Sequence, residues 1–358
     1  MSQKQRYIRQ TGLTRFGPEG QKKLENGSVL IVGLGGLGIP AAQYLNSMGV
    51  GTLGLVEQDA VELHNLQRQV LYDEKDVGRP KLEAALEKLR QQNTETNFKT
   101  FDTFLTKDNA LNIIKGFDLV VDATDNFATR YLINDACVIL KKPFVYGALH
   151  GFEGQVAVFN QQDGPTYRCL FPNPPDSDEI PNCDENGVLG VLPGIVGTLQ
   201  ALEAVKVLTG VGEVLSGKLL LYDGLIQSTQ KINLKAIPEN KNTTKLNTSY
   251  DVSECTTIHS VTADEFIFHH GKGELQLIDV RTEREFKNHH LDGANNIPLR
   301  ELESSLERIN FNMPVYLICQ SGQRSKIAFE KLRKHHPEAI LFNVSGGMAN
   351  LSLHVGTD

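Results

Sequence analysis

The chain has 358 residues, of which 40% are hydrophobic and 22% charged, and its formal net charge is −7. This length allows two domains with sizeable cores. The acidic balance argues against general affinity for nucleic acid or for an anionic membrane surface. The first residues, MSQKQRYIRQ, lack the apolar run of a secretion signal, so we expect a cytoplasmic protein.

The distribution of apolar residues and cysteines argues against a membrane protein and against a disulfide-stabilised protein. The longest apolar segment, residues 188–210, is interrupted by Pro193, Glu203 and Lys206, which favours a core helix over a membrane span. The five cysteines are an odd number, which argues against a disulfide framework. A functional cysteine would then be a nucleophile or a ligand. We expect no nucleic-acid partner and no membrane partner.

The first 150 residues alternate between strand-like and helix-like runs. Apolar runs of strand length occupy residues 28–33, 52–57, 117–124 and 144–149. Runs with helical character occupy residues 40–49, 80–93 and 128–140. This alternation predicts an α/β fold with a Rossmann-like, mostly parallel sheet that is covered by helices on both faces. Ligands of such sheets bind beyond the carboxyl ends of the strands.

The pattern changes after residue 150. Antiparallel-looking strands are expected at residues 154–160, 218–223 and 230–236. Residues 236–256 are polar, rich in Asn and Thr and without period, which is typical of a linker. A smaller α/β unit follows, with buried strands at residues 275–280 and 314–319 and a helix at residues 325–336. The predicted domains are residues 1–235 and 257–358.

The stretch VLIVGLGGLG, residues 29–38, places Gly33, Gly35 and Gly38 directly after the first strand. Glycines at this spacing let the backbone approach a phosphate at a helix N-terminus, and the pattern alone is typical of dinucleotide-binding proteins. Glu57 ends the second strand, where a carboxylate suits the ribose hydroxyls of either NAD or ATP.

Polar motifs beyond the next strand ends distinguish these two nucleotides. They are HNLQRQ with Asn65 and Arg68, GRPK with Lys81, and DATDN with Asp122, Asp125 and Asn126. A triphosphate needs several cations and a carboxylate that holds magnesium, whereas the pyrophosphate of a dinucleotide needs far fewer. Arg68 and Lys81, converging with Asp125 on a phosphate-binding turn, therefore indicate ATP.

The motifs RYIRQ, LIVGLGGLG, NLQRQ, VGRPK, DATDN and NGVLGVLPGIVGTLQALEAVK follow one another over about residues 5–235. Here the chain resembles the adenylyltransferases of molybdopterin and thiamine biosynthesis, which are relatives of the ubiquitin-activating enzymes. The resemblance implies an enzyme that binds ATP and the C-terminal Gly-Gly carboxylate of a ubiquitin-like sulfur carrier. Such an enzyme forms the carrier acyl-adenylate and releases pyrophosphate. A carboxylate is already ionised at neutral pH, so the reaction needs fixed cations and orientation but no general base.

The resemblance also implies roles for individual residues. The nucleotide-binding set is Gly33, Gly35, Gly36, Gly38, Glu57, Asn65, Arg68, Lys81, Asp125 and Asn126, of which Asn65, Arg68 and Lys81 contact phosphates. Gly36 touches the nucleotide, and Glu57, where the family usually has Asp, holds the ribose. Asp125 holds Mg²⁺ and positions the reacting centre. Arg9 reaches the triphosphate of the partner subunit, since the family forms homodimers.

Members of this family often carry two Cys-x-x-Cys pairs that hold zinc. Here Thr166 replaces one cysteine of the first pair, only Cys169 remains, and the sequence has no second pair downstream. A structural zinc site needs four ligands, so we expect no zinc and a buried, apolar Cys169. Cys183 lies in the polar loop IPNCDENG, where exposure favours reactivity. For Cys183 the resemblance implies a catalytic thiol that forms a thioester or acyl disulfide with the carrier.

A second chemical motif, VYLICQSGQRSKIAF, reads as a strand, a loop and a helix. The loop residues are Cys319, Gln320, Ser321, Gly322, Gln323, Arg324 and Ser325. Backbone N–H groups of such a loop, with the charge of Arg324, would stabilise a thiolate or persulfide anion. Asp279 and Arg281 belong to the motif DVR in LIDVRTEREFKNHHLDGANNIPL, and residues 258–350 resemble the rhodanese sulfurtransferases. The resemblance implies that Cys319 carries a persulfide, supplied by a donor such as a cysteine desulfurase.

Together these features predict a fusion that activates a carrier with Mg-ATP and then delivers sulfur to give a thiocarboxylate. A nicotinamide oxidoreductase and a non-catalytic carrier-binding scaffold stay open as alternatives, and a Cys-x5-Arg loop also occurs in protein phosphatases. The sequence leaves open whether the carrier serves molybdopterin synthesis, thiamine synthesis or tRNA thiolation.

Overall fold

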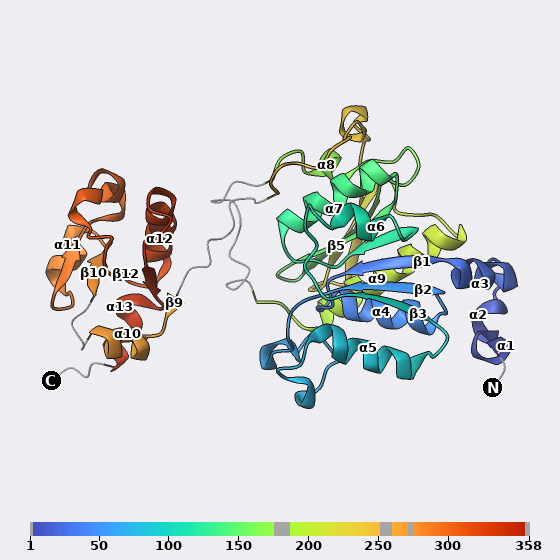
Figure 1. Ribbon diagram of the computed structural model, residues 1–358, viewed down its shortest axis with the longest axis horizontal. Coiled ribbons are helices and arrows are strands. Elements are labelled where there is room, and N and C mark those ends of the chain that lie inside the picture. The colour runs from blue at the N-terminus through green and yellow to red at the C-terminus, as the bar shows by residue number, and fades with distance from the viewer. Residues whose placement is uncertain (1–2, 175–186, 251–259, 271–274, 355–358) are drawn as a thin grey trace. The chain divides into compact units, whose positions relative to one another are not determined.

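The structure is a computed structural model that describes residues 3–174, 187–250, 260–270 and 275–354. The chain divides into two units, Met1–Val252 and Ser253–Asp358, and each has its own sheet and core (Figure 1).

The first unit is built on a sheet whose strand order is β3-β2-β1-β4-β5-β6-β7-β8. The strands are β1 (Ser28–Val32), β2 (Thr52–Val56), β3 (Asn97–Phe101), β4 (Leu119–Asp122), β5 (Phe144–His150), β6 (Glu153–Phe159), β7 (Lys218–Asp223) and β8 (Ser228–Asn233). The strands from β3 to β5 pair in parallel, whereas β6, β7 and β8 add antiparallel strands. The predicted mostly parallel α/β sheet is therefore confirmed, as is the antiparallel extension.

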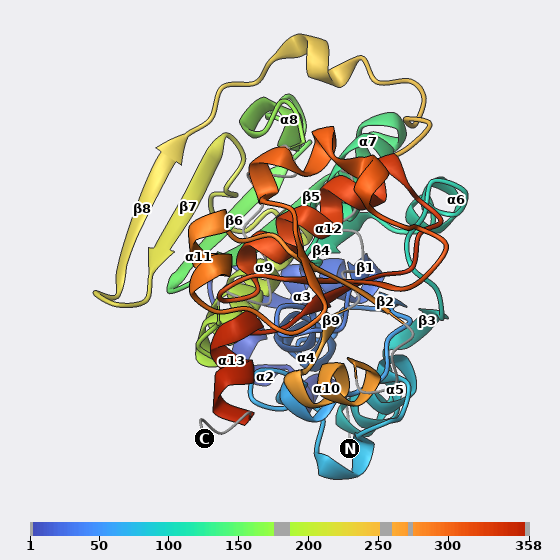
Figure 2. The same ribbon diagram turned by 90° about the vertical axis from the view of Figure 1, so that its left-hand side faces the viewer.

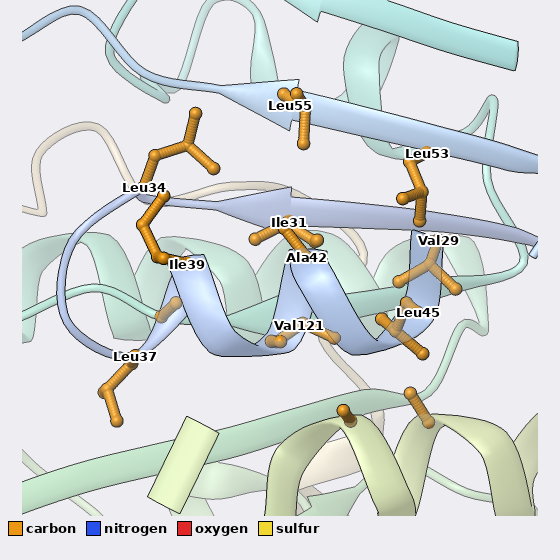
Figure 3. Packing of buried hydrophobic residues seen from close by; sticks show 14 of the residues in the cluster. Val29, Ile31, Leu34, Leu37, Ile39, Ala42, Leu45, Leu53, Leu55 and Val121 are labelled. Atoms are coloured by element: carbon orange, nitrogen blue, oxygen red, sulfur yellow. The ribbon is translucent and has the colours of Figure 1, made fainter. Parts of the chain in front are cut away.

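Helices cover both faces of this sheet (Figure 1). They are α1 (Gln3–Arg6), α2 (Ile8–Thr11), α3 (Gly17–Asn26), α4 (Gly38–Ser47), α5 (Lys81–Gln92), α6 (Ala110–Ile114), α7 (Phe127–Leu140), α8 (Tyr167–Leu170) and α9 (Val191–Thr209), with short 3₁₀ turns at Leu63–Asn65, Glu74–Asp76 and Pro238–Lys241. Alternate residues of β1 serve the two cores, because successive strand side chains point to opposite faces. Val29 and Ile31 pack toward α4 (Figure 3), and Leu30 and Val32 join the core on the other face.

Helix α9 is the apolar segment that the sequence predicts as a core helix. By length and composition alone it could cross a membrane, and half of it is buried inside the protein. It packs against α4, β5 and β6. A Cβ on Gly197 would lie 2.3 Å from the carbonyl oxygen of Leu37, so only glycine allows α9 to approach the start of α4 this closely. These contacts place α9 in the core of the unit.

Residues 237–250, which we call the strap, lie against the first unit although their composition is typical of a linker. Figure 2 shows the chain leaving β8 and passing over α8 and α7. The strap residues Leu246 and Tyr250 pack on the core beneath. The Tyr250 hydroxyl donates to Asp135 Oδ2 at 2.8 Å, and Arg168 Nε donates to Asp135 Oδ1 at 2.7 Å. The side chains of Leu246 and Tyr250 and the hydrogen bonds of Asp135 thus fix the strap on the first unit, although its sequence has no hydrophobic periodicity.

The second unit has a five-stranded parallel sheet with the order β11-β10-β12-β13-β9. Its elements are β9 (Ser260–Val261), α10 (Ala263–His270), β10 (Gln276–Asp279), α11 (Glu283–Asn288), β11 (Ala294–Asn296), β12 (Val315–Ile318), α12 (Gln323–His335), β13 (Leu341–Val344) and α13 (Gly347–His354), with 3₁₀ turns at Leu299–Ser304 and Leu306–Arg308. Asp279 pairs with Ile318 across β10 and β12. The DVR motif and the Cys319 loop therefore begin at neighbouring strand ends.

Candidate active sites in the two units

The glycine turn joins β1 to α4 and packs directly on the segment that follows β4. Gly33 has φ +93°, and a Cβ on it would lie 2.9 Å from the carbonyl oxygen of Ala123. A Cβ on Gly38 would lie 1.8 Å from the carbonyl oxygen of Gly33. Only glycine fits these two positions. The turn and the DATDN motif lie together at one edge of the sheet, as the strand pattern predicts.

Glu57 fixes the glycine turn to the end of β2. Its Oε2 accepts the Leu34 N–H at 2.8 Å, and its Oε1 accepts the N–H groups of Gln58 and Asp59, both at 2.9 Å. The carboxylate is only 7% exposed. Glu57 lies beside the turn, where the sequence pattern places it. Its bonds to backbone N–H groups were not predicted, because almost every residue has an N–H group and residue type does not show which ones bond.

Lys81 and Arg68 both lie at the margin of the turn. Lys81 begins α5, and its buried ammonium lies 3.2 Å from Asp59 Oδ2. A Cβ on Gly36 would lie 3.5 Å from Arg68 Cγ, so the stem of Arg68 runs beside the turn. Asp59 was not predicted, although the pattern Glu57-x-Asp59 after a strand was visible in the sequence.

Two side chains near the turn contribute in ways that sequence reasoning did not predict. The buried Tyr72 hydroxyl donates to the Leu34 carbonyl at 3.1 Å and lies 3.3 Å from the Lys81 carbonyl oxygen, which connects the turn to α5. Asn65 is buried in its own 3₁₀ turn, where Oδ1 accepts the Glu62 N–H at 3.2 Å. The predicted contact of Asn65 with phosphate stays a prediction.

Asp125 and Asn126 are exposed where β4 gives way to α7. Asn126 is the N-cap of α7, and its Oδ1 accepts the Thr129 N–H at 2.8 Å. The Asp125 carboxylate has no hydrogen-bond partner among the described residues. Asp125 thus follows the Ala123–Thr124 segment that packs on the glycine turn, whereas Asp122 before that segment is completely buried.

The other predicted residues of this unit fall away from the turn or outside the description. Arg9 is exposed on α2. Cys183 lies outside the described residues. Cys137 is buried within α7, and burial raises the pKa of its thiol, so it is an inert core residue.

Cys169 is not the buried, apolar residue that we predicted. It is partly exposed, and its Sγ accepts N–H groups from Thr166 at 3.4 Å, Ile237 at 3.2 Å and Asn240 at 3.6 Å. Burial acts to raise the pKa of the Cys169 thiol, but these bonds and the Thr166 hydroxyl outweigh it and lower that pKa. Two of these donors, Ile237 and Asn240, belong to the strap, which therefore contacts α8 at Cys169. An N–H group is not a metal ligand. The described residues contain no group of three or more metal-ligating side chains, and the prediction of no zinc stays a prediction.

Cys319 follows β12 at the start of a loop that surrounds its sulfur with donors. Its Sγ accepts the Gly322 N–H at 3.1 Å, and the Ser325 hydroxyl lies 3.5 Å away. Burial raises the pKa of the thiol, but hydrogen bonds from the Ser325 side chain and from the backbone of Ser325, Ser321 and Gly322 outweigh it, so the net pKa is lowered. This loop stabilises an anionic sulfur with oriented dipoles.

The charge of Arg324 is paired with a carboxylate and also interacts with Cys319: the Glu285 hydrogen bond and charge raise the pKa of Arg324 most, and the charge of the Cys319 sulfur raises it further. Glu285 of α11 accepts both Nη1 and Nη2 of Arg324, at 2.8 and 2.6 Å, and this pairing holds the pKa of Glu285 far below its usual value. Arg281 is likewise held by Asp279, at 2.7 Å, with Gln320 Oε1 3.3 Å from its Nη1. Glu285 was missed because it lies 39 residues from Arg324 in the chain.

The residues around the glycine turn fit ATP with magnesium. The side chains of Leu34 and Leu37 on the turn are buried, Lys81 and Arg68 supply cations, and Asp125 offers a carboxylate without a protein partner in the described part of the chain. Hard cations such as Mg²⁺ bind carboxylate oxygens together with phosphate oxygens.

Comparisons with known proteins match each of the two units. A family model described as "ThiF family" matches residues 7–244, and one described as "Rhodanese-like domain" matches residues 262–354. The "Sulfur carrier protein adenylyltransferase" of Thermus thermophilus is 52% identical over 238 residues, covering 65% of this chain and 88% of that protein. The "Adenylyltransferase and sulfurtransferase MOCS3" of Culex quinquefasciatus is 39% identical over 359 residues, covering 91% of this chain and 81% of that protein. Escherichia coli MccB has a similar fold, with a TM-score of 0.59 and 22% identity over 66% of this chain and 74% of the solved chain.

The fold, the two sites and these matches define an enzyme in which an adenylyltransferase is joined to a sulfurtransferase domain. Adenylyltransferases take the adenylyl group from ATP. The chain belongs to the ThiF family and carries a rhodanese-like domain after that family's region. This assignment excludes the nicotinamide oxidoreductase, the non-catalytic scaffold and the phosphatase that the sequence motifs had left open.

Proposed function

We propose that the first unit uses Mg-ATP to adenylate the C-terminal glycine of a ubiquitin-like sulfur carrier, and that Cys319 of the second unit supplies persulfide sulfur to the activated carboxyl. One observation carries this proposal: a single chain holds an ATP-type turn edged by Arg68, Lys81 and Asp125 and a thiol whose loop favours its anion. The name of the Thermus relative supports the first activity, and the name of the Culex relative supports both. A cytoplasmic location suits both substrates.

Adenylation forms one bond and breaks one bond at the α-phosphorus of ATP. The carrier carboxylate attacks that phosphorus, pyrophosphate leaves, and the carrier becomes an acyl-adenylate. Lys81 and Arg68 offset the repulsion between the anionic nucleophile and the phosphates, and Asp125 is the residue that would hold Mg²⁺. Magnesium, when bound, neutralises charge on the phosphate oxygens.

Sulfur transfer then consumes the acyl-adenylate. The outer sulfur of the Cys319 persulfide attacks the acyl carbon, AMP leaves, and an acyl disulfide joins Cys319 to the carrier. A second thiol attacks the Cys319 sulfur, which releases the thiocarboxylate and leaves a disulfide that a thiol reductant must reopen. Cys183 is our candidate for this second thiol, and a cysteine desulfurase is the candidate donor that reloads Cys319.

Exchange of labelled pyrophosphate into ATP tests the first step directly. Purified sulfur carriers that end in Gly-Gly are added one at a time to the full chain. We expect one carrier to stimulate exchange and Asp125→Ala to abolish that stimulation while carrier binding persists. Exchange that no carrier stimulates would refute carrier adenylation, and full activity of the Asp125 variant would remove this residue from the mechanism. The stimulating carrier also decides among molybdopterin synthesis, thiamine synthesis and tRNA thiolation.

A complementation experiment tests the proposed homodimer and the role of Arg9. Arg9→Ala and Asp125→Ala each disable a site, but a hybrid dimer would contain one site with both residues intact if Arg9 acts on the partner's triphosphate. Mixing the two inactive variants should therefore restore a fraction of the exchange activity. If light scattering shows a dimer and the mixture stays inactive, Arg9 does not act across the subunits.

A further inference from the structure

Asp122 and Arg130, two buried residues near the exposed Asp125, both form hydrogen bonds with Thr124, the residue that precedes Asp125. Asp122 Oδ1 accepts the Thr124 N–H at 3.1 Å and the Thr124 hydroxyl at 2.7 Å. On the other side, Arg130 Nη2 donates to the Thr124 carbonyl at 2.9 Å. Every hydrogen-bonding group of Thr124 is thereby engaged by Asp122 or Arg130. We call this arrangement the Thr124 clamp.

Both arms of the clamp are themselves fixed. Asp122 is the last residue of β4 and has no exposed surface, and Gln200 of α9 donates to its carbonyl at 2.6 Å. The Arg130 guanidinium lies over the rings of Phe127 and Tyr146, at 5.7 and 5.4 Å from their centroids. Such cation–π contacts add to its fixation. The clamp is therefore tied to the sheet and to two helices.

The clamp also sets the relation between Asp125 and the glycine turn. Ala123 donates its N–H to the Val32 carbonyl at 3.0 Å, and its own carbonyl lies where a Cβ of Gly33 would clash. Asp125 follows Thr124 directly. The tripeptide Ala123-Thr124-Asp125 thus contacts the glycine turn through Ala123 and carries the Asp125 carboxylate at its other end.

The cost of this arrangement argues for a function. Among the described residues, Asp122 Oδ2 and Arg130 Nε have no hydrogen-bond partner, although both atoms are buried. Burial raises the pKa of Asp122, against the opposing effects of the Arg130 charge and the Thr124 hydrogen bonds. Buried polar atoms without hydrogen-bond partners cost stability, and apolar residues of similar volume would often serve the fold as well.

We infer that Asp122 and Arg130 are positioning residues for adenylation, which hold Thr124 so that Asp125 meets the phosphates bound at the glycine turn. This inference rests on the proposed role of Asp125. A displacement of a reacting group by about 1 Å can cost about 100-fold in rate. Loss of the clamp should thus reduce kcat and leave the affinity for ATP nearly unchanged, since Lys81, Arg68 and the turn stay in place.

The test compares Asp122→Asn with Asp135→Asn. Asp135 lies on the same helix as Arg130 and forms a largely buried ion pair with Arg168, at 2.7 and 2.8 Å, but it does not hydrogen-bond to Thr124 or to the glycine turn. In carrier-stimulated exchange, Asp122→Asn should lower kcat by about 10- to 100-fold with a KM for ATP within about two-fold of wild type. Asp135→Asn should lower the melting temperature and leave kcat unchanged.

Amide hydrogen exchange supplies a readout that does not depend on activity. The peptide covering residues 122–130 should exchange faster in Asp122→Asn than in wild type, but not in Asp135→Asn. Should Asp122→Asn fail to fold, Thr124→Val, which removes the clamped hydroxyl, takes its place, with Thr124→Ser as the variant expected to restore kcat. A folded Asp122→Asn or Thr124→Val with wild-type kcat, beside an inactive Asp125→Ala, would overturn the clamp and leave the proposed function standing. An active Asp125→Ala would overturn both.

Discussion

The glycine turn of the first unit and the Cys319 loop of the second both follow a parallel strand and precede a helix, yet they treat charge in opposite ways. Around the turn, Asp125 has no partner among the described residues, and Lys81 shares an ion pair with a half-exposed Asp59. At the loop, Arg324 and Arg281 are each held by a carboxylate, Glu285 and Asp279. The anion there is stabilised by N–H and O–H donors.

This difference follows from what each site must do. A site that binds a polyanion from solution needs charges that can exchange their partners for phosphate and metal. A site that keeps an anionic sulfur on its own side chain needs a fixed surrounding, and backbone dipoles supply one without mobile counter-charges. The same strand–loop–helix arrangement thus binds a nucleotide from solution in one unit and stabilises an anionic cysteine sulfur in the other.

Separating the two activities is the strongest way to break this comparison. Cys319→Ala removes the only group at the loop that can carry sulfur, so thiocarboxylate formation should fall by at least about a thousand-fold, while pyrophosphate exchange stays within about two-fold of wild type. Mass spectrometry of the carrier measures the thiocarboxylate. Cys169→Ser, which alters a partly exposed thiol of the first unit, is the control and should keep both activities. Continued sulfur transfer by Cys319→Ala would move the sulfur-carrying role to another cysteine.

Removing one exchangeable cation sharpens the comparison at the turn. Lys81→Met should weaken ATP binding by about 10- to 100-fold, because a hydrogen bond to a charged group contributes about 1.5–3 kcal/mol. Lys88→Met is the matched control: Lys88 lies on the same helix and is ion-paired with Asp73 and Asp76, away from the turn. Calorimetric titration with ATP distinguishes them. Equal ATP affinity in the two variants would exclude Lys81 from phosphate binding.

A smaller effect is expected when one dipole of the Cys319 loop is removed. A hydrogen bond to the thiolate favours the charged form, so its loss in Ser325→Ala should raise the pKa of Cys319 by about one unit. The rate of alkylation by iodoacetamide would then rise at a higher pH than in wild type, and it would be lower at pH 7. Ser321→Ala keeps its backbone N–H and should behave as wild type. Identical pH profiles for all three proteins would show that the hydroxyl does not act on the sulfur.

The smallest effect concerns the strap, which serves neither site. Cys169→Ala removes the acceptor for three N–H groups, and we expect a melting temperature lower by about 2–4 °C. Cys169→Ser keeps an acceptor and should lie closer to wild type. A zinc chelator should leave both melting curves unchanged. A chelator-dependent drop in the wild-type protein would instead show that a metal holds the strap.

Local pattern predicted much of this molecule. The alternation of apolar runs predicts the parallel sheet, and the glycine spacing with Glu57 and DATDN predicts which strand ends meet, because side-chain period and strand direction are properties of short segments. Long-range partners were not predictable in this way. Tyr72 and Glu285 act through residues 38 and 39 positions away, and nothing in either local sequence indicates the partner.

One prediction was wrong for a different reason, and one segment packs more closely than its composition indicates. The composition of the strap is typical of a linker, but Leu246 and Tyr250 pack on the core of the first unit. Cys169 was predicted to be apolar because the second cysteine pair is missing. Two of the four donors around its sulfur are the backbone N–H groups of Thr166 and Ile237, and every residue except proline possesses such a group. Amino-acid composition describes side chains and does not predict hydrogen bonds from backbone N–H groups.

The paired arginines of the second unit have a consequence for ionic strength. Dissolved salt screens exposed charges over roughly 10 Å at 0.1 M, but it has little effect on short hydrogen bonds to a buried sulfur. Capture of nucleotide at the first unit should therefore weaken steadily as salt is added. The reactivity of the Cys319 thiol should stay constant, so that the slow step of the overall reaction shifts toward carrier activation in concentrated buffers.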